Sequence, residues 1–172
     1  MSEVKVRKVM LADIEMLQEI GRITFFESFF EFNTPEDMAL YLKDDFSIEK
    51  FSNEISTVGS EFEFAIIDNV VVGYLKTNIG NAQMDLQHEN ALEIQRIYVK
   101  KEFHGCGVGQ LLFDKAFEKA LDKNVEFIWL GVWEQNPRAI RFYEKNGFVF
   151  FGKHPFMLGN DFQEDILMKR KM

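Results

Sequence analysis

The sequence predicts an α/β (α+β) fold in which a mixed central sheet carries helices on its faces. Two observations lead to this prediction. Residues 61–67 and 70–78 are alternating strands joined by the turn Asp68-Asn69, which indicates an antiparallel hairpin. Farther along the chain, apolar strands alternate with helical segments, and such units place strands side by side in parallel. The length of 172 residues and the 47% apolar content suit one compact domain over residues 1–172.

The N-terminal third is expected to begin with one strand and to continue as three helices. Val4 and Val6 alternate with charged residues, which is typical of a half-buried strand. Asp13 can cap the first helix, and Thr34 followed by Pro35 marks the start of the second. The predicted ranges are 4–10 for the strand and 13–30, 34–45 and 47–56 for the helices.

The remaining elements alternate between strand and helix. Apolar residues recur every four positions from Val108 to Ala120, which predicts a helix with one buried face. Residues 80–90 form the most polar connection, and we expect a mobile loop there. The predicted strands are 92–99, 125–132, 148–152 and 163–169, and the last helix is 136–145.

Three alternate glycines, Gly105, Gly107 and Gly109, stand between an apolar strand and the start of a helix. Without a Cβ they let backbone N–H groups approach a ligand closely, and the helix N-terminus adds unpaired N–H groups. Both features suit a phosphate. Gln110 and Leu112 stand where a dinucleotide fingerprint needs its last glycine, and Gln110 also replaces the lysine of a nucleoside-triphosphate loop. A glycine-rich turn without a ligand is the alternative.

A second segment, residues 130–148, has a recognisable order. After a strand come Asn136, two residues, Ala139-Ile140, one residue, Phe142-Tyr143, three residues, and Gly147-Phe148. This order resembles the second signature of the GCN5-related N-acetyltransferase (GNAT) superfamily. The glycine loop resembles its first signature, Gln/Arg-x-x-Gly-x-Gly, with His104 at the place usually held by Gln or Arg.

The resemblance extends over nearly the whole chain to the bacterial PaiA-type acetyltransferases, whose substrates are spermidine and spermine. The segments that carry it are 33–46, 92–98, 129–134 and 157–159. It implies the GNAT acyltransferase fold, with a seven-stranded mixed sheet, helices on both faces and two central strands that splay apart. It also implies acetyl-CoA as the cofactor and direct attack by a primary amine in a ternary complex. A protein N-terminus, a lysine or another small amine is an alternative acceptor, and a non-catalytic acetyl-CoA-binding regulatory module is an alternative class.

The same resemblance implies roles for individual residues. Tyr143 corresponds to the general acid that protonates the coenzyme A thiolate, and a core tyrosine beside Phe142 is the alternative. Asn136 corresponds to a residue that binds the cofactor near its sulfur, and it can also be a plain helix N-cap. The other residues expected to bind the cofactor are Ile97, Tyr98 and Val99 for the pantetheine arm and His104, Gly105, Cys106, Gly107, Val108, Gly109 and Gln110 for the pyrophosphate.

The acceptor amine must lose a proton, and Glu93 is the candidate base because it lies within an apolar strand. A solvated glutamate at a sheet edge is the alternative. Gln95 lies on the same side of the strand, where some polyamine acetyltransferases carry an acid, so a water chain ending at Glu93 is a workable substitute.

Three further residues are candidates to bind the acceptor. Glu27 and Glu31 lie four residues apart on one helix face beside phenylalanines, so they could hold ammonium groups. A solvated acidic helix end explains the same pair. Trp133 is the third candidate.

Charge and composition restrict the partners. A net charge of −8 makes nucleic acid a poor partner, whereas a polycation would fit. No stretch has the length of a membrane span, and the three histidines, His88, His104 and His154, lack metal-ligand spacing. The single cysteine, Cys106, suits a reducing cytoplasm, and nothing around it in the sequence supports a nucleophile. The family resemblance also makes a homodimer an expectation.

Overall fold

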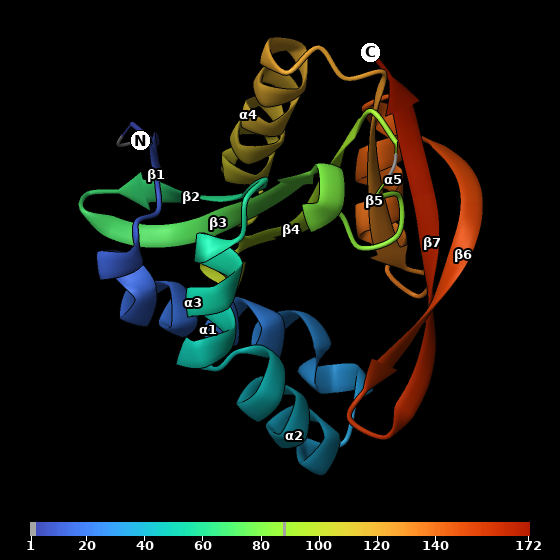
Figure 1. Cartoon of the computed structure of the whole chain (residues 1–172). Helices are drawn as coiled ribbons and strands as arrows, with labels where there is room; N and C mark the ends of the chain where they lie inside the picture. Colours follow the sequence, from blue (N-terminus) through green and yellow to red (C-terminus); the bar gives the residue numbers. More distant parts are fainter. Residues whose placement is uncertain (1–2, 88) are drawn as a thin grey trace.

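The computed structural model describes residues 3–87 and 89–172. Its seven-stranded sheet has the order β1-β2-β3-β4-β5-β7-β6, and helices lie on both faces (Figure 1). The β4–β5 pair is parallel and all the other pairs are antiparallel, which confirms the predicted mixed sheet. The strands are β1 Lys5–Lys8, β2 Ser60–Ile67, β3 Val70–Ile79, β4 Ala91–Val99, β5 Phe127–Trp133, β6 Val149–Leu158 and β7 Asp161–Lys171.

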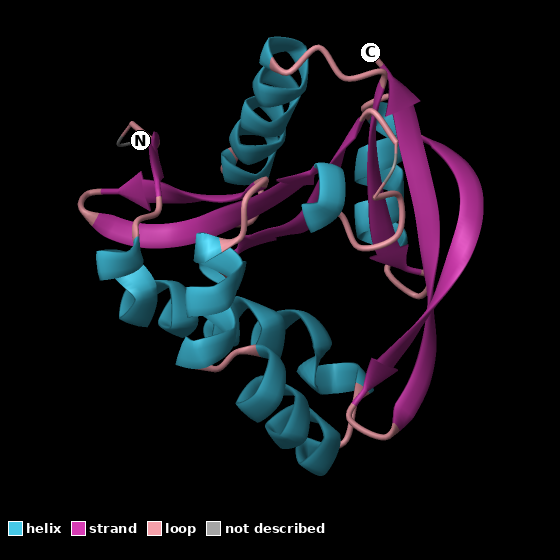
Figure 2. Cartoon of the chain, in the orientation of Figure 1, coloured by secondary structure: helices cyan, strands magenta, loops and turns pink. Residues whose placement is uncertain are grey.

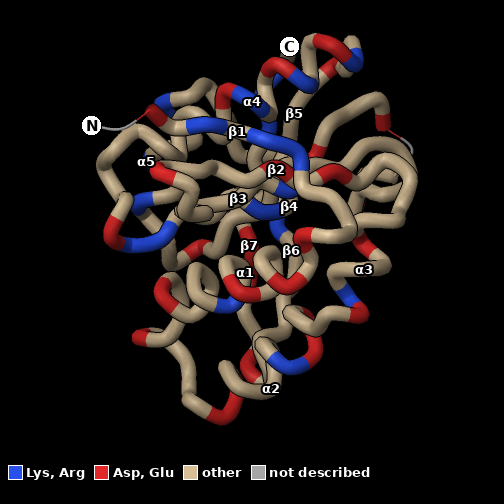
Figure 3. The backbone as a smooth tube through the Cα atoms, turned by 90° about the vertical axis from the view of Figure 1, so that its left-hand side faces the viewer, with Lys and Arg blue, Asp and Glu red and all other residues tan. Residues whose placement is uncertain are grey.

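Three helices cover one face of the sheet, and their packing follows from the aromatic content. Helices α1 (Ile14–Phe29), α2 (Pro35–Asp45) and α3 (Ile48–Ser56) lie on the same side of β2–β4 (Figure 1). Phe25 of α1, Phe51 of α3 and Phe46 of the turn between α2 and α3 are buried together with Phe62 and Phe64 from β2. Acidic residues recur along α1 and α2 (Figure 3), in agreement with the net charge of −8.

The opposite face is covered by α4 (Val108–Asp122) and α5 (Pro137–Lys145). The apolar residues that recur every four positions in α4 are almost completely buried, as the sequence predicts: Val108, Leu112, Ala116 and Ala120. They pack in one cluster with residues of β3, β4 and β5. No helix in the described part of the chain is long and apolar enough to span a membrane.

Local signals place most helix starts correctly. The Thr34 and Ser47 hydroxyls accept hydrogen bonds from backbone N–H groups in the first turns of α2 and α3, and Asn136 does the same for α5. Asp13 differs, because its carboxylate binds the guanidinium of Arg7 at 2.8 Å and the backbone N–H of Met10 and makes no cap hydrogen bond to α1.

Strand β6 is longer than predicted. It pairs with β7 from Val149 to Leu158, beyond the predicted end at residue 152 and through Pro155. Proline has no N–H, but β6 is the edge strand of the sheet, so one of its sides needs no hydrogen bonds. The predicted strand therefore ended six residues too early.

The connection between β3 and β4 is anchored, although its polarity predicts a mobile loop. The buried Gln83 side chain donates to the carbonyl oxygens of Gly80, Leu86 and Glu89. Its own carbonyl accepts a 2.6 Å hydrogen bond from the indole of Trp129 in β5. The hydrogen bonds of this one side-chain amide hold the connection in place. A hydropathy pattern does not predict such bonds, because it registers glutamine only as polar.

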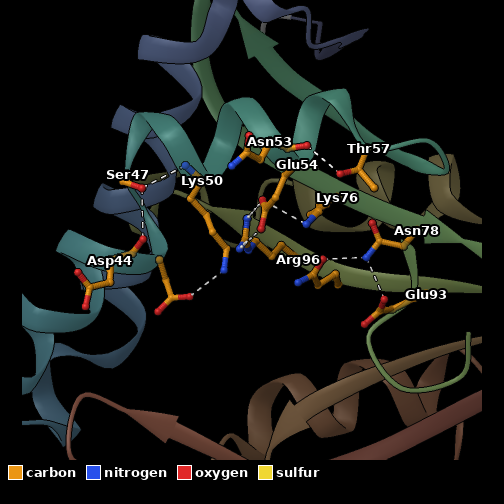
Figure 4. Close-up of polar contacts among 12 residues, drawn as sticks. Asp44, Ser47, Lys50, Asn53, Glu54, Thr57, Lys76, Asn78, Glu93 and Arg96 are labelled. Carbon is orange, nitrogen blue, oxygen red and sulfur yellow. Dashed lines mark hydrogen bonds and ion pairs between the residues drawn. The ribbon is translucent and has the colours of Figure 1, made fainter. Parts of the chain in front are cut away.

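A buried ion cluster attaches α3 to the sheet (Figure 4). Glu54 of α3 accepts two hydrogen bonds from Arg96 of β4, at 2.8 and 3.1 Å, and lies 3.1 Å from Lys76 of β3. Burial would raise the pKa of Glu54, but the two cations outweigh it and hold that pKa below its usual value. Burial and the neighbouring Arg96 lower the pKa of Lys76 to about 8.

We expect Glu54→Gln to lower the free energy of unfolding by about 3–5 kcal/mol, because it leaves two buried cations without an anion. Lys76→Met preserves the Glu54–Arg96 pair and should change stability by less than about 1 kcal/mol. Urea denaturation of both variants measures this difference. Equal stabilities for the two variants would show that the cluster does not depend on Glu54.

Candidate active site

The central feature of the site is the divergence of β4 from β5. The two strands pair at only three positions, and the last pair is Glu93 with Trp129. Directly after this pair, the β3–β4 register shifts so that Gln95 has no partner in β3. Such a bulge bends its strand and increases the twist. Beyond Glu93, β4 follows β3 while β5 follows β7, and the two strands separate (Figure 2).

A cavity of about 570 Å³ lies at this divergence. It is lined by both separating strands, by the aromatic side of α1, by α5 and by β6 and β7. Six residues predicted from the sequence line this one cavity: Glu93, Ile97, Tyr98, Trp133, Asn136 and Tyr143. The backbone of β4 beyond Glu93 has no strand partner on this side, so an extended molecule could pair with it there.

The glycine loop leads from the end of β4 into α4 and leaves open space. Gly105 and Gly107 have φ values of +80° and +82°, which other residues rarely adopt. A Cβ added to Gly105, Gly107 or Gly109 would meet no atom within 4 Å. The first turn of α4 also leaves the N–H groups of Val108, Gly109 and Gln110 without intrahelical acceptors. The loop therefore has the open space and the free N–H groups that a bound phosphate needs.

His104 braces this loop. Its Nδ1 lies 2.9 Å from a guanidinium nitrogen of Arg138, and its Nε2 lies 2.8 Å from the carbonyl oxygen of Val99. Because a guanidinium group can only donate, Nδ1 accepts the hydrogen bond from Arg138. Nε2 then carries the hydrogen and donates it in a hydrogen bond to the carbonyl oxygen of Val99. Arg138 in α5 thus places a cation beside the loop. Sequence reasoning missed it, although it stands two residues after Asn136 in the second signature.

Glu93 is buried beside the cavity, with an exposed fraction of 3%. Its carboxylate accepts hydrogen bonds from the Asn78 amide at 2.9 Å and from the Met84 backbone N–H at 3.0 Å. Burial raises the pKa of Glu93 and outweighs these two hydrogen bonds, which lower it. A carboxylate with a raised pKa is suited to accept a proton.

Asn78 joins the two residues that sequence analysis singled out on β4. Its amide nitrogen donates to Glu93 and, at 2.8 Å, to the side-chain oxygen of Gln95 (Figure 4). Asn78 lies opposite Glu93 in the β3–β4 register. Sequence reasoning missed it because that register depends on the bulge at Gln95. The signal was the run of polar residues from Lys76 to Asn78 near the end of a strand that begins apolar.

Tyr143 of α5 reaches the cavity from the side of β5, and its exposed fraction is 6%. Its ring packs against Phe142 and Phe148. Burial raises the pKa of its phenol, so the hydroxyl keeps its proton at neutral pH and can donate it. Tyr143 is therefore both a core tyrosine and a residue of the cavity lining, so its burial does not argue against a role as general acid.

Glu27 and Glu31 do not line the cavity. The carboxylate of Glu27 accepts a 2.8 Å hydrogen bond from the backbone N–H of Lys101, and Glu31 is exposed in the short helix after α1. Other acids, Asp85 and Asp165, line it instead. The structure does not place these two glutamates at the cavity. The side of α1 that faces the cavity carries Phe25 and Phe29 instead.

Cys106 is partly exposed within the loop, and its sulfur lies 4.0 Å from the carbonyl oxygen of His104. Across residues 3–87 and 89–172, no group of three His, Cys, Asp or Glu side chains is placed to hold a metal ion. His88, one of the histidines considered above, lies outside the described residues.

The fold and cavity together define an acyl-CoA-dependent transferase. Residues 22–148 match the Acetyltransferase (GNAT) family, and the chain belongs to it. It is therefore an N-acetyltransferase that uses acetyl-CoA.

Relatives place the chain more closely within this family. It is 41% identical over 172 residues to an uncharacterized N-acetyltransferase of Lactobacillus delbrueckii subsp. lactis, covering 100% of this chain and 99% of the relative. A spermidine N(1)-acetyltransferase of Thermoplasma acidophilum is 26% identical over 149 residues, covering 84% of this chain and 88% of the relative. The crystal structure of PaiA N-acetyltransferase from the same organism, in complex with coenzyme A, superposes with a TM-score of 0.80 at 25% identity and covers 99% of both chains. PaiA is thus a distant relative.

We expect Gly109→Ala to weaken coenzyme A binding without harming the fold. Nothing in the protein lies within 4 Å of the added methyl group, and alanine favours a helix over glycine by up to about 1 kcal/mol. The methyl group would occupy space through which the phosphate approaches the backbone N–H groups. The affinity for coenzyme A should therefore fall about tenfold or more, as expected when one hydrogen bond to a charged group is lost. Calorimetric titration and thermal unfolding measure the two effects.

The matched control is Glu118→Ala, farther along α4, which should leave the affinity for coenzyme A unchanged. Unaltered binding by Gly109→Ala would contradict the assignment of the loop.

Proposed function

We propose that this chain transfers the acetyl group of acetyl-CoA to a primary amine of spermidine or spermine by direct attack in a ternary complex. The observation that carries the proposal is the presence of a buried carboxylate, Glu93, and a buried phenol, Tyr143, in one cavity. The acids that line this cavity and the aromatic rings of Phe29 and Trp133 suit a polycation. The spermidine acetyltransferase among its relatives supports the same acceptor.

Several residues of this chain would hold acetyl-CoA, which supplies the acetyl group as an activated thioester. The backbone N–H groups of residues 107–110 suit the pyrophosphate, whereas the N–H of Cys106 already donates to the carbonyl oxygen of Phe103. The cation of Arg138 lies beside the loop. The free edge of β4 at Ile97 and Val99 suits the pantetheine arm, with Tyr98 between them. Asn136 would contact the cofactor near its sulfur.

Glu93 and Tyr143 have opposite roles in the proposed reaction. Glu93 accepts a proton from the acceptor ammonium, directly or through water, and so makes the amine nucleophilic. Tyr143 donates a proton to the departing thiolate. Holding both partners in one cavity supplies much of the rate, since effective concentrations of well-oriented groups reach on the order of 10⁵ M or more. We further propose that the reaction takes place in the cytoplasm.

The test is incubation of the purified protein with acetyl-CoA and a mixture of spermidine, spermine, amino acids, aminoglycosides and short peptides, followed by mass spectrometry. Acetylspermidine or acetylspermine should be the dominant product. A dominant acetylated peptide or amino acid would replace the polyamine with another acceptor. Tight acetyl-CoA binding without any acetylated product would favour the regulatory module.

Tyr143→Phe should lower kcat by about 10²- to 10⁴-fold, the usual contribution of a general acid, and should leave coenzyme A binding unchanged. Tyr74→Phe is the matched control. The Tyr74 hydroxyl is buried outside the cavity with no hydrogen-bond partner in the described structure, so its removal should not slow turnover. Full activity of Tyr143→Phe would refute the general-acid role.

Glu93→Gln should lower kcat/KM by about 10²- to 10⁴-fold and remove the acid limb of the pH profile. The active form of this base is the carboxylate, and burial raises its pKa above the usual value for glutamate. The activity of the parent should therefore fall as the pH drops through this raised pKa. Glu126→Gln, on the exposed surface, should keep the parent profile. An unchanged acid limb in Glu93→Gln would assign the base to another group.

A further inference from the structure

A second end of the cavity carries polar groups that the proposed reaction does not use. Gln163, Asp165 and Leu167 alternate along β7 and line the cavity, so one face of this strand is turned toward it. The Gln163 side chain is 8% exposed. Its amide nitrogen donates to Asn33 at 2.8 Å and to Asp161 at 2.9 Å. Its carbonyl oxygen is buried without a hydrogen-bond partner in the described structure.

Asp165 lies two residues farther along the same face. Within residues 3–87 and 89–172, its carboxylate has no hydrogen-bond or salt-bridge partner, and one carboxylate oxygen lies 3.4 Å from the site of a Cβ on Gly131. His154 stands opposite it on β6, but the His154 imidazole already lies 3.2 Å from the carboxylate of Asp85. Burial raises the pKa of Asp165 to about 6, so it is largely ionised at neutral pH.

The end of the cavity near Glu93 likewise has a carboxylate beside a buried side-chain amide oxygen. Asn78 is 1% exposed, both of its hydrogen bonds leave through the amide nitrogen, and its carbonyl oxygen is buried without a partner among the described residues. Ser60, opposite Asn78 in β2, also has a buried hydroxyl without a partner. Each end thus combines a carboxylate that has no salt bridge within the described residues with a buried carbonyl oxygen that accepts no hydrogen bond there. Buried acceptors of this kind are costly unless a ligand supplies the donors.

We propose that Asp165 and Gln163 form a distal ammonium site, which binds the second protonated amine of the acceptor while Glu93 serves the amine that is acetylated. The inference rests on the proposed function and identifies the residues that would select a diamine over a monoamine. An ammonium group has donors only, so it would satisfy both the Asp165 carboxylate and the Gln163 carbonyl oxygen.

The strand registers set the separation of the two ends. Glu93 pairs with Trp129, and Asp165 pairs with Trp133. Four residues correspond to about 13 Å along β5, and β4 and β7 lie on opposite sides of β5, which adds about 10 Å across the sheet. Both side chains line the space between these positions, so a linear diamine of several methylene groups is the matching ligand.

The experiment is calorimetric titration of the coenzyme A complex, in which no turnover occurs, with 1,8-diaminooctane and with 8-amino-1-octanol. The parent protein should bind the diamine at least about tenfold more tightly than the amino alcohol, as expected for a charge-assisted hydrogen bond. Asp165→Asn should remove this preference by weakening the diamine alone. Glu164→Gln is the matched control, because this neighbour does not line the cavity and pairs with Lys153, and it should keep the preference.

Several outcomes would overturn the proposal. One is equal binding of the two ligands by the parent protein, which needs no variant and so does not depend on whether Asp165→Asn folds. Another is an equal loss for both ligands in Asp165→Asn, or no loss at all. Failure of the proposed function gives a different pattern, in which the diamine preference and its dependence on Asp165 persist but polyamines are not acetylated.

Discussion

The short contact between β4 and β5 determines where everything functional in this chain can lie. Three residue pairs join these strands, and the bulge at Gln95 then turns β4 away with β3, while β5 remains with β7. The cavity, the free backbone edge of β4 and the presence of both Glu93 and Tyr143 in the cavity lining follow from that divergence. A continuous β4–β5 ladder would bring β4 and β5 together along the length that now lines the cavity.

Charges in and around the cavity fall into two groups. Glu54 pairs with Arg96 and Lys76, and Asp45 pairs with Lys50. The first set of contacts holds α3 against the sheet, and the second joins α2 to α3. Glu93 and Asp165 have no cation in a salt bridge within the described structure. Buried charge that the protein has already paired supports structure, whereas buried charge without a counterion indicates where a cationic ligand is expected.

Local patterns in the sequence were enough for the elements and the glycine loop, because caps, turns and periodicity act over a few residues. Thr34, Asn136 and the buried face of α4 follow directly from such signals. Contacts between distant segments were not predictable in this way. The bond of Glu27 to Lys101, the hydrogen bond between Arg138 and His104 and the alignment of Asn78 with Glu93 depend on packing and register, which one sequence does not encode locally. The far half of β6 was also missed, because it is held as a strand by its pairing with β7 as far as Leu158.

The anchored connection before β4 couples the position of its backbone at Met84 to the protonation of Glu93. The N–H of Met84 donates to the carboxylate of Glu93, one residue after Gln83 fixes the loop to Trp129. A hydrogen bond to the charged form of an acid strengthens that acid. The hydrogen bond from Met84 therefore favours the carboxylate form of Glu93, and by thermodynamic linkage a proton on Glu93 weakens this one contact with the loop. The charge state of Glu93 therefore affects how firmly Met84 and the loop around it are held against β4.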